Sequence, residues 1–383
     1  MTQVIKKRRI VLASVLKPVD DTRMFEKIGA TLADSGEFEV VIIGYPSEKP
    51  PTPSNIKFHT LPFFKRLSLK RLLIPWIVFK KINQVKPELI IINTPELLLV
   101  AVLNRVFFGR KIIYDVLENY YRNIRFTPAF PLLLRPVLAI VVRFVELVTS
   151  PLLHHFLLAE KAYSQELSFA TPHTVLQNKL PQSIAARHTC PPYPNFVGRR
   201  RAGKQSRGYS RLVFSGTLSA STGIFEAIRL CKHLHEIDDS FSLTIIGYCA
   251  IPEVLGKIKN EIGGSSFIAL IGGDTLVPHN EILHQIGLAD MGIVIYPPNL
   301  STRSSIPTKL FEYLAVRLPI LIRHNTESHQ LVEKCKAGIK LEAAPEYASL
   351  SATLKSRRFT PVPPDSIFWE ADAKNLTNCL KLL

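Results

Sequence analysis

The segment SSIPTKLFEYLAVRLPIL, residues 304–321, carries the pattern that decides the fold. Pro307 suits the start of a helix, where its missing N–H costs nothing. The following TKLFEYLAVR has apolar residues at helical spacing, and LPILIRH (318–324) then has the composition of a buried strand. A helix followed by an apolar strand predicts one unit of a parallel sheet covered by helices.

Two side chains of this helix could bind an anionic ligand. The N–H groups and positive dipole end of a helix suit a diphosphate, and Lys309 in the first turn adds a point charge. Glu312 lies on roughly the same face, where its carboxylate can accept hydrogen bonds from the two hydroxyls of a ribose. The alternative is a surface ion pair between Lys309 and Glu312. Arg303, in the preceding polar loop, could bind phosphate or remain solvated.

The same alternation of strands and helices extends through the whole chain. The strand-like runs are RIVLASVL (9–16), FEVVIIGY (38–45), ELIIIN (88–93), KIIYDV (111–116), RLVFSG (211–216), SLTIIGY (242–248), SFIALIGG (266–273) and DMGIVIYPP (290–298). Strands that are apolar throughout and separated by helices indicate parallel sheets buried on both faces. Ligands of such sheets bind beyond the carboxyl ends of the strands.

A Pro-, Gly- and Arg-rich stretch interrupts this pattern and predicts a linker at 181–210. We therefore expect an α/β protein with two doubly wound Rossmann-like domains facing a central cleft. The predicted boundaries are 1–180 for an N-terminal acceptor-binding domain and 211–365 for a C-terminal nucleotide-sugar-binding domain. Residues 366–383 are predicted to form a C-terminal helix that could return to the N-terminal domain. A length of 383 residues fits two such domains.

The composition is that of a folded, basic protein. It is 46% hydrophobic and 21% charged, which argues against disorder, and its net charge of +17 implies an anionic partner. Five dispersed cysteines without metal-like spacing predict reduced thiols in the cytoplasm. The N-terminus shows no signal-peptide pattern, and the apolar runs are too short to predict a membrane-spanning helix.

Three segments resemble GT-B glycosyltransferases, and more narrowly the family-4-like bacterial enzymes that build surface polysaccharides. They are KPVDDTRMFEKIGATLADSG (17–36), FSGTLSASTGIFEAIRL (214–230) and SSIPTKLFEYLAVRLPIL (304–321), the last being close to an S-x-P-x-K-x-x-E-Y-x-A-x-x-x-P-I signature. Weaker matches at 114–124, 157–163 and 176–181 occur in the expected order between them. The resemblance implies transfer of a sugar from a nucleotide diphosphate to an acceptor, with retention of configuration.

The resemblance also implies a donor site in the C-terminal domain. It assigns diphosphate binding to Gly216 and Thr217, where a glycine lets the backbone approach a ligand closely. Gly247, Tyr248 and Gly272 follow other strands and could flank the base, with Tyr248 stacking on it, or form ordinary turns. We also expect Arg303, Ser304, Thr308, Lys309, Glu312 and Tyr313 to contact the donor.

Several positions depart from the pattern of the relatives. Thr217 and Thr222 replace an arginine and a lysine that usually bind phosphate, which leaves Lys309 and Arg303 with that task. Ser304 occupies the place of a first glutamate, and Leu117 occupies that of a histidine near the reacting sugar. No D-x-D motif is present, so we expect transfer without a metal and without a further cofactor, the departing diphosphate being stabilised by Lys309 and the helix dipole.

The acceptor side is predicted in the N-terminal domain. Asp21 could cap the helix that follows it, and Arg23 could meet an anionic group. Asn93 and Asp115 end neighbouring strands, and Glu118 could act as a base on the acceptor hydroxyl. The predicted catalytic residues are thus Lys309, Glu312 and Glu118, and the predicted acceptor-binding residues are Asp21, Arg23, Asn93, Asp115 and Glu118.

Basic and aromatic residues are interleaved in FFKRLSLKRLLIPWIVFKK (63–81), and residues 126–158 are strongly apolar. This pattern favours a surface that lies on anionic lipid, although a core helix with a basic outer face would look similar. We expect a cytoplasmic protein, peripheral on the inner face of the plasma membrane, acting on a lipid-linked or glycan acceptor. The alternatives are a non-catalytic membrane-peripheral GT-B subunit and a nucleotide-sugar epimerase. Charge alone suggests nucleic acid, but no nucleic-acid-binding motif is visible.

Overall fold

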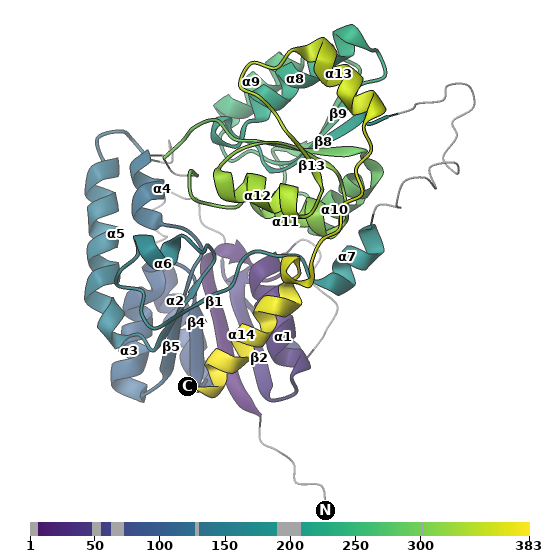
Figure 1. Cartoon of the computed structure of the whole chain (residues 1–383). Helices are drawn as coiled ribbons and strands as arrows, with labels where there is room; N and C mark the ends of the chain where they lie inside the picture. Colours follow the sequence, from purple (N-terminus) through teal and green to yellow (C-terminus); the bar gives the residue numbers. More distant parts are fainter. Residues whose placement is uncertain (1–6, 48–54, 63–72, 127–129, 190–207, 301) are drawn as a thin grey trace, which may run out of the picture. The chain divides into compact units, whose positions relative to one another are not determined.

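The computed structural model describes residues 7–47, 55–62, 73–126, 130–189, 208–300 and 302–383 (Figure 1). The chain divides into two compact units. Unit 1 comprises Met1–Asn178 and Trp369–Leu383, and unit 2 comprises Lys179–Phe368. The expected pair of doubly wound Rossmann-like domains is confirmed, because each unit contains a parallel sheet flanked by helices.

Unit 1 contains a parallel sheet in the order β3-β2-β1-β4-β5-β6-β7. Its strands are β1 (Arg8–Pro18), β2 (Phe38–Tyr45), β3 (Ile56–Thr60), β4 (Leu89–Ile92), β5 (Lys111–Val116), β6 (His155–Leu158) and β7 (His173–Val175). Its helical segments are η1 (Thr22–Gly29), α1 (Ala30–Asp34), α2 (Ile74–Val85), η3 (Pro95–Leu97), α3 (Leu98–Phe108), α4 (Tyr120–Phe126), α5 (Arg135–Thr149), η4 (Ser150–Leu152), α6 (Tyr163–Glu166) and α14 (Trp369–Lys381).

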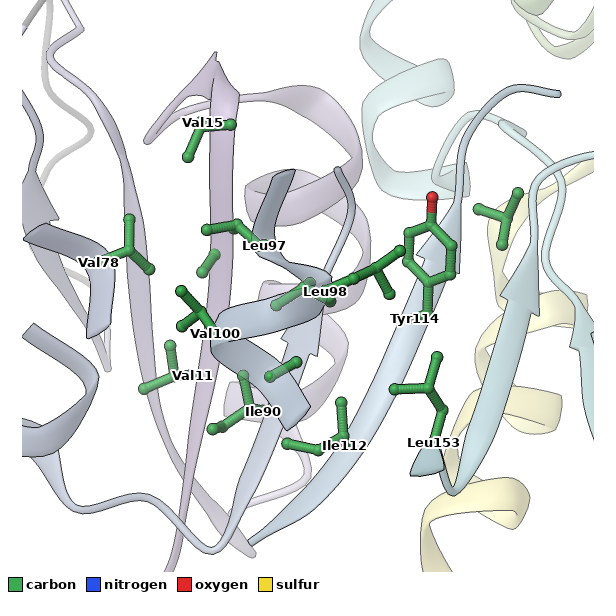
Figure 2. Packing of buried hydrophobic residues seen from close by; sticks show 14 of the residues in the cluster. Val11, Val15, Val78, Ile90, Leu97, Leu98, Val100, Ile112, Tyr114 and Leu153 are labelled. Carbon is green, nitrogen blue, oxygen red and sulfur yellow. The ribbon is translucent and has the colours of Figure 1, made fainter. Parts of the chain in front are cut away.

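Strand β1 shows why this sheet is apolar throughout. Successive side chains of a strand point to opposite faces, so both faces of a doubly covered sheet need apolar residues. Val11 and Val15 pack in the core under α2 and α3, which Figure 2 shows together with Val78, Leu98 and Tyr114. Ile10 and Leu12, on either side of Val11, pack in a second core that includes residues of η1, α1 and α14.

Unit 2 contains a parallel sheet in the order β10-β9-β8-β11-β12-β13. Its strands are β8 (Arg211–Thr217), β9 (Ser242–Tyr248), β10 (Ile268–Gly273), β11 (Met291–Ile295), β12 (Ile320–Arg323) and β13 (Gly338–Lys340). Its helical segments are α7 (Gln182–His188), η6 (Ala220–Thr222), α8 (Ile224–Ile237), α9 (Pro252–Ile262), α10 (His279–Leu288), α11 (Thr308–Ala315), α12 (Thr326–Lys334), α13 (Tyr347–Ser356) and η7 (Asp365–Ile367).

The final helix α14 packs on unit 1 beside α1 (Figure 1). Trp369 donates a hydrogen bond from its indole Nε1 to Thr31 Oγ1 at 2.8 Å, and Asp372 accepts one from the backbone of Gln177 at 2.7 Å. The helix begins at Trp369, three residues later than predicted, and the preceding turn η7 lies in unit 2.

The predicted linker at 181–210 needs a correction, because residues 182–188 form α7, whose Ala185 is buried in a core of unit 2. Residues 190–207 lie outside the described part of the chain, as do residues 63–72 of the basic aromatic segment. Cys231, Cys249, Cys335 and Cys379 are buried free thiols. Among the described helices, none combines the length and the apolar character that crossing a membrane requires.

Candidate functional site

Lys309 is the most unusual charged residue of unit 2. Its side chain is buried at 5% exposure, and its Nζ has no hydrogen-bond partner within the described residues. The Nζ lies 3.5 Å from the ring centroid of Phe214 and 5.7 Å from that of Tyr296. Burial lowers the pKa of Lys309 to about 7, although the carboxylate of Glu312 opposes this shift. Within the described residues this ammonium is therefore buried without a hydrogen-bonded counter-ion, and the nearby charge of Glu312 offsets only part of the cost.

Helix α11 places Lys309 at its second residue. Pro307 occupies the N-cap position and no side chain caps the helix. The loop before α11 is held by Asn325, the N-cap residue of α12, whose Nδ2 donates to the carbonyls of Arg303 at 3.2 Å and Ser305 at 2.8 Å. The uncapped amide end of α11 and the Lys309 ammonium therefore lie together, which is an arrangement that suits an anion.

Three glycines pair across the carboxyl ends of adjacent strands, with Gly216 of β8 opposite Gly247 of β9, and Gly247 opposite Gly272 of β10. All three have positive φ angles, of 93°, 151° and 84° respectively. A Cβ at Gly247 would collide with the carbonyl oxygen of Gly216, and one at Gly272 would crowd that of Gly247. The packing of the strand ends therefore explains the glycines at 247 and 272. This favours the alternative that these two positions form ordinary turns.

Gly216 differs from the other two glycines because its open side faces the lysine. Apart from its chain neighbours, the one atom of the described residues within 4 Å of a Cβ built there is Lys309 Cε, at 3.8 Å. The carboxyl end of β8 and the start of α11 are therefore adjacent, with Lys309 between them. Thr217, the last residue of β8, is exposed. Thr222 supports this turn by donating its hydroxyl to the carbonyl of Thr217 at 2.8 Å.

Glu312 lies one turn after Lys309 and has a partner that the sequence did not reveal. Its Oε1 lies 3.1 Å from Nε2 of His279, the first residue of α10. Both side chains are largely buried, at 12% and 14% exposure. A lone histidine without a spacing motif gives no sequence signal, so this contact could be found only in the structure.

Tyr313 was predicted to contact the donor, and the structure contradicts this. Its side chain is fully buried, and its hydroxyl oxygen accepts a hydrogen bond from the backbone N–H of Ser215 at 3.1 Å. The ring packs against Gly292 of β11, where a Cβ would not fit. The helical period turns Tyr313 away from the side of Lys309, so this residue joins α11 to the sheet.

The remaining predicted donor residues lie near the surface of unit 2. Tyr248 is 37% exposed at the end of β9, and Arg303 and Thr308 are also exposed. Ser304 is half-buried in the loop before α11. Their exposure leaves them available to a ligand.

Arg23 and Asp115 were predicted to bind an acceptor, and the structure instead pairs them with each other. Arg23 Nη2 donates to Asp115 Oδ1 at 2.6 Å, and its Nε donates to Oδ2 at 2.8 Å. A further nitrogen, Nη1, donates to the carbonyl of Leu176 at 2.7 Å and to Asn178 at 3.0 Å. Both charged side chains are buried, at 4% and 1% exposure. This bidentate pair joins η1, β5 and the segment after β7, so its role is structural.

Three other predicted acceptor residues have different environments. Asp21 caps η1 by accepting hydrogen bonds from the backbone N–H groups of Arg23 and Met24, which is the helix-capping role expected for it. Asp21 Oδ2 also lies 3.6 Å from Lys17 Nζ. Glu118 is exposed and accepts a hydrogen bond from Asn123. The carboxylates of Asp21 and Glu118 both raise the pKa of Lys17, which places these three charges near one another.

Asn93 follows β4 and is 2% exposed. Neither its amide nitrogen nor its amide oxygen has a hydrogen-bond partner among the described residues, and the hydroxyl of the adjacent Thr94 also lacks one. Tyr120 donates its hydroxyl to the backbone carbonyl of Asn93 at 2.8 Å. Buried amide groups without partners are rare, so Asn93 remains a candidate for contact with a polar ligand.

No protein-family model matches the chain, and no curated protein matches it. Solved structures show the same fold at low sequence identity. A sucrose-phosphate synthase from Thermosynechococcus elongatus has a TM-score of 0.67 and 13% identity, covering 98% of this chain and 99% of its own. Anabaena HepE in complex with UDP and glucose has a TM-score of 0.64 and 12% identity, covering 98% and 100%. A Listeria monocytogenes protein described as a UDP-N-acetylglucosamine 2-epimerase has a TM-score of 0.57 and 12% identity, covering 98% and 96%.

These neighbours define the fold class. The two helix-covered parallel sheets of this chain are the two Rossmann-like domains of the GT-B fold. The same fold is present in proteins named for synthesis and for epimerisation, so the activity of this chain has to be argued from its own site.

Proposed function

We propose that this protein is a glycosyltransferase that uses a nucleotide diphosphate sugar as donor. The observation that carries the proposal is the buried ammonium of Lys309, which has no hydrogen-bond partner in the described part of the chain and lies between the carboxyl end of β8 and the uncapped start of α11. A diphosphate would supply a hydrogen-bonded counter-ion for Lys309 and accept hydrogen bonds from the N–H groups of the helix. The binding of UDP by the structural neighbour HepE supports this class of donor.

The proposed chemistry is stabilisation of a departing diphosphate. Negative charge develops on the diphosphate as the bond to the sugar breaks, and Lys309 with the positive end of α11 would stabilise that charge. Glu312, oriented by His279, would accept hydrogen bonds from the ribose hydroxyls. Glu118, exposed beyond β5, is our candidate base for the acceptor hydroxyl. Retention of configuration and metal-independent transfer remain predictions.

Replacing Glu312 with alanine should weaken the binding of nucleoside diphosphates by about 10- to 100-fold, because hydrogen bonds to a charged group contribute about 1.5–3 kcal/mol. Binding of inorganic pyrophosphate, which lacks a ribose, should be unchanged. Ligand-induced stabilisation against thermal unfolding measures both. Glu327→Ala, which changes an exposed glutamate of another unit 2 helix, α12, is the matched control. Equal weakening of both ligands would remove the ribose assignment.

We further propose that the acceptor is lipid-linked and that unit 1 lies on an anionic membrane, at the cytoplasmic face. Helix α5 exposes an apolar stripe at helical spacing, with Val137 at 59%, Ile140 at 59%, Phe144 at 63% and Val148 at 57% exposure. Its opposite side, including Ala139 and Glu146, is buried. A helix with an exposed apolar stripe buries that stripe in lipid or in a partner.

The charges of the neighbouring helices favour lipid. Helices α2, α3 and α5 lie along one face of the unit 1 sheet (Figure 1). Their basic residues are Lys80, Lys81, Arg105, Arg135 and Arg143, and their single acidic residue, Glu146, is buried. A basic, apolar surface is complementary to a bilayer that contains anionic lipids.

Substituting Val137 and Phe144 together with serine should reduce binding to phosphatidylcholine–phosphatidylglycerol vesicles by at least about 10-fold, since each buried side chain of this size contributes about 1.5–3 kcal/mol. The fold should be retained because both side chains are exposed. Vesicle sedimentation measures the change. Leu276→Ser with Val362→Ser, at exposed apolar positions of unit 2, is the control. Unchanged sedimentation of the α5 variant would contradict the membrane part of the proposal.

A second candidate function is a non-catalytic nucleotide-binding subunit. The pairing of Arg23 with Asp115 favours it, because two side chains expected at the acceptor are used in the fold. Leu117 in place of a histidine points the same way. Incubation with a panel of nucleotide sugars separates the candidates: a transferase should hydrolyse or transfer at least one of them, an epimerase should change a sugar without an acceptor, and a binding subunit should do neither.

A further inference from the structure

A basic hollow of about 610 Å³ lies at the amino ends of β1, β4 and β5 in unit 1, at the opposite edge of the sheet from Asn93 and Asp115. Its lining includes the basic residues Arg8, Lys86, Arg110 and Lys111, together with Glu88 and Phe108. None of these residues belongs to the sites described above, so the hollow has no role in the proposed transfer.

Negative charges close to the hollow balance only part of the positive charge of its lining. Lys86 and Gly109 end α2 and α3 in left-handed conformations, and each helix end brings about half a negative charge. Glu88 adds one more and lies 3.4 Å from Arg8. The lining has four cations, and the negative charges of Glu88 and the two helix ends sum to about two. The hollow therefore has a net charge of about +2. This excess is available to an anion.

One of the cations is fixed in place. Arg110 is buried at 8% exposure and donates through Nη1 to Asn83 Oδ1 at 2.8 Å and to Asn104 Oδ1. Its guanidinium carbon lies 4.6 Å from the ring centroid of Phe108. The hollow therefore has a rigid charged residue beside an aromatic ring, with the more exposed Lys86 and Lys111 around it.

Aromatic contacts connect the hollow to the apolar surface of the same unit. Phe108 lies 6.3 Å from Phe79, and Phe79 lies 5.9 Å from Trp76, as ring centroids. Trp76 and Phe108 are about half exposed, and Phe107 beside them is 69% exposed. Tryptophan favours the boundary between lipid and water, and a charged pocket beside an apolar surface has the chemistry of a phospholipid, whose phosphate adjoins its acyl chains.

We propose that this hollow binds the phosphate headgroup of an anionic phospholipid while the surface of α2, α3 and α5 contacts the acyl region. The proposal rests on the membrane association proposed above and adds a specific headgroup site to it. The lipid is distinguished from a free phosphate because the aromatic contacts continue from the hollow onto the apolar surface.

The test compares vesicles of phosphatidylcholine alone with vesicles that also contain phosphatidylglycerol, using the full chain. The double variant Lys86→Gln, Lys111→Gln should bind phosphatidylglycerol vesicles about 30-fold more weakly than the wild type, at about fivefold for each lysine. Its binding to phosphatidylcholine should be unchanged. Lys57→Gln with Lys161→Gln removes the same charge from exposed positions of unit 1 away from the hollow, and should have little effect.

Each other outcome overturns the proposal in a recognisable way. Equal losses for the two double variants would show that net charge, rather than the hollow, attracts the membrane. Thermal stabilisation of the wild type by inorganic phosphate, lost in the Lys86 and Lys111 variant, would assign the hollow to a free anion if vesicle binding is unaffected. Failure of membrane association itself is detected separately, because the wild type would then sediment with neither kind of vesicle. Binding of nucleoside diphosphates is a further independent measurement, because it reports on unit 2 alone.

Discussion

Replacing Lys309 with methionine is expected to stabilise the free protein while weakening nucleoside diphosphate binding about 10- to 100-fold. The stability should rise by about 1–4 kcal/mol, because methionine removes a buried ammonium that has no hydrogen-bond partner among the described residues. The affinity should fall because a charge-assisted hydrogen bond to the diphosphate is lost. Thermal unfolding with and without ligand measures both changes. A methionine variant that the ligand stabilises as much as the wild type would end the assignment of Lys309 to the diphosphate.

The pH dependence of the folding stability tests this prediction independently. Folding lowers the pKa of Lys309 from its usual 10.5 to about 7, so between these values the unfolded chain binds more protons than the folded protein. The contribution of Lys309 to stability should therefore become more favourable as the pH rises from about 7 to about 10.5, and be least favourable below pH 7. This slope should be absent from the methionine variant. Denaturant unfolding at several pH values would show it.

The second large effect concerns unit 1. Asp115→Ala should reduce the stability of this unit by about 3–5 kcal/mol, because it leaves the buried guanidinium of Arg23 without its carboxylate. Denaturant unfolding should show an earlier transition for unit 1 and leave that of unit 2 in place. Glu88→Ala, which removes an exposed ion pair with Arg8, should cost less than about 1 kcal/mol.

A double variant tests the cause of this effect. Asp115→Leu combined with Arg23→Met removes both charges and should recover most of the lost stability, since a buried pair can often be exchanged for apolar residues. If the single alanine variant is as stable as the wild type, the pair does not hold η1 to β5, and the acceptor role predicted from the sequence would be open again.

The sequence allowed the fold to be predicted because the central strands of both sheets are apolar runs, whereas the short strands β3, β6, β7 and β13 were not predicted. It also indicated Lys309 and Glu312, because Pro307 marks the start of α11 and the spacing places both residues early in it. Arg23 and Asp115 show the limit of this reasoning. Each follows or ends a strand, as an acceptor-binding residue would, but a contact across 92 residues leaves no local pattern.

The wrong assignment of Tyr313 and the omission of His279 have a common physical origin. A motif identifies which residues occur together along the chain, while helix rotation decides which of them face the sheet. Tyr313 follows Glu312 directly and points into the core, whereas His279 comes from another helix and contacts Glu312. Burial and partners at this level depend on tertiary packing, which a single sequence does not specify.

The return of α14 to unit 1 has a consequence for biosynthesis. Unit 2 is one continuous segment, and its two ends meet, since Leu180 pairs with Phe368 as an isolated bridge. All of unit 2 therefore leaves the ribosome before α14 does. Until α14 emerges, Met24, Ile28 and Leu32 lack the cover of Trp369 and Leu376. We expect the nascent N-terminal unit to complete its folding last, after the segment inserted within it, and to need protection from aggregation during that interval.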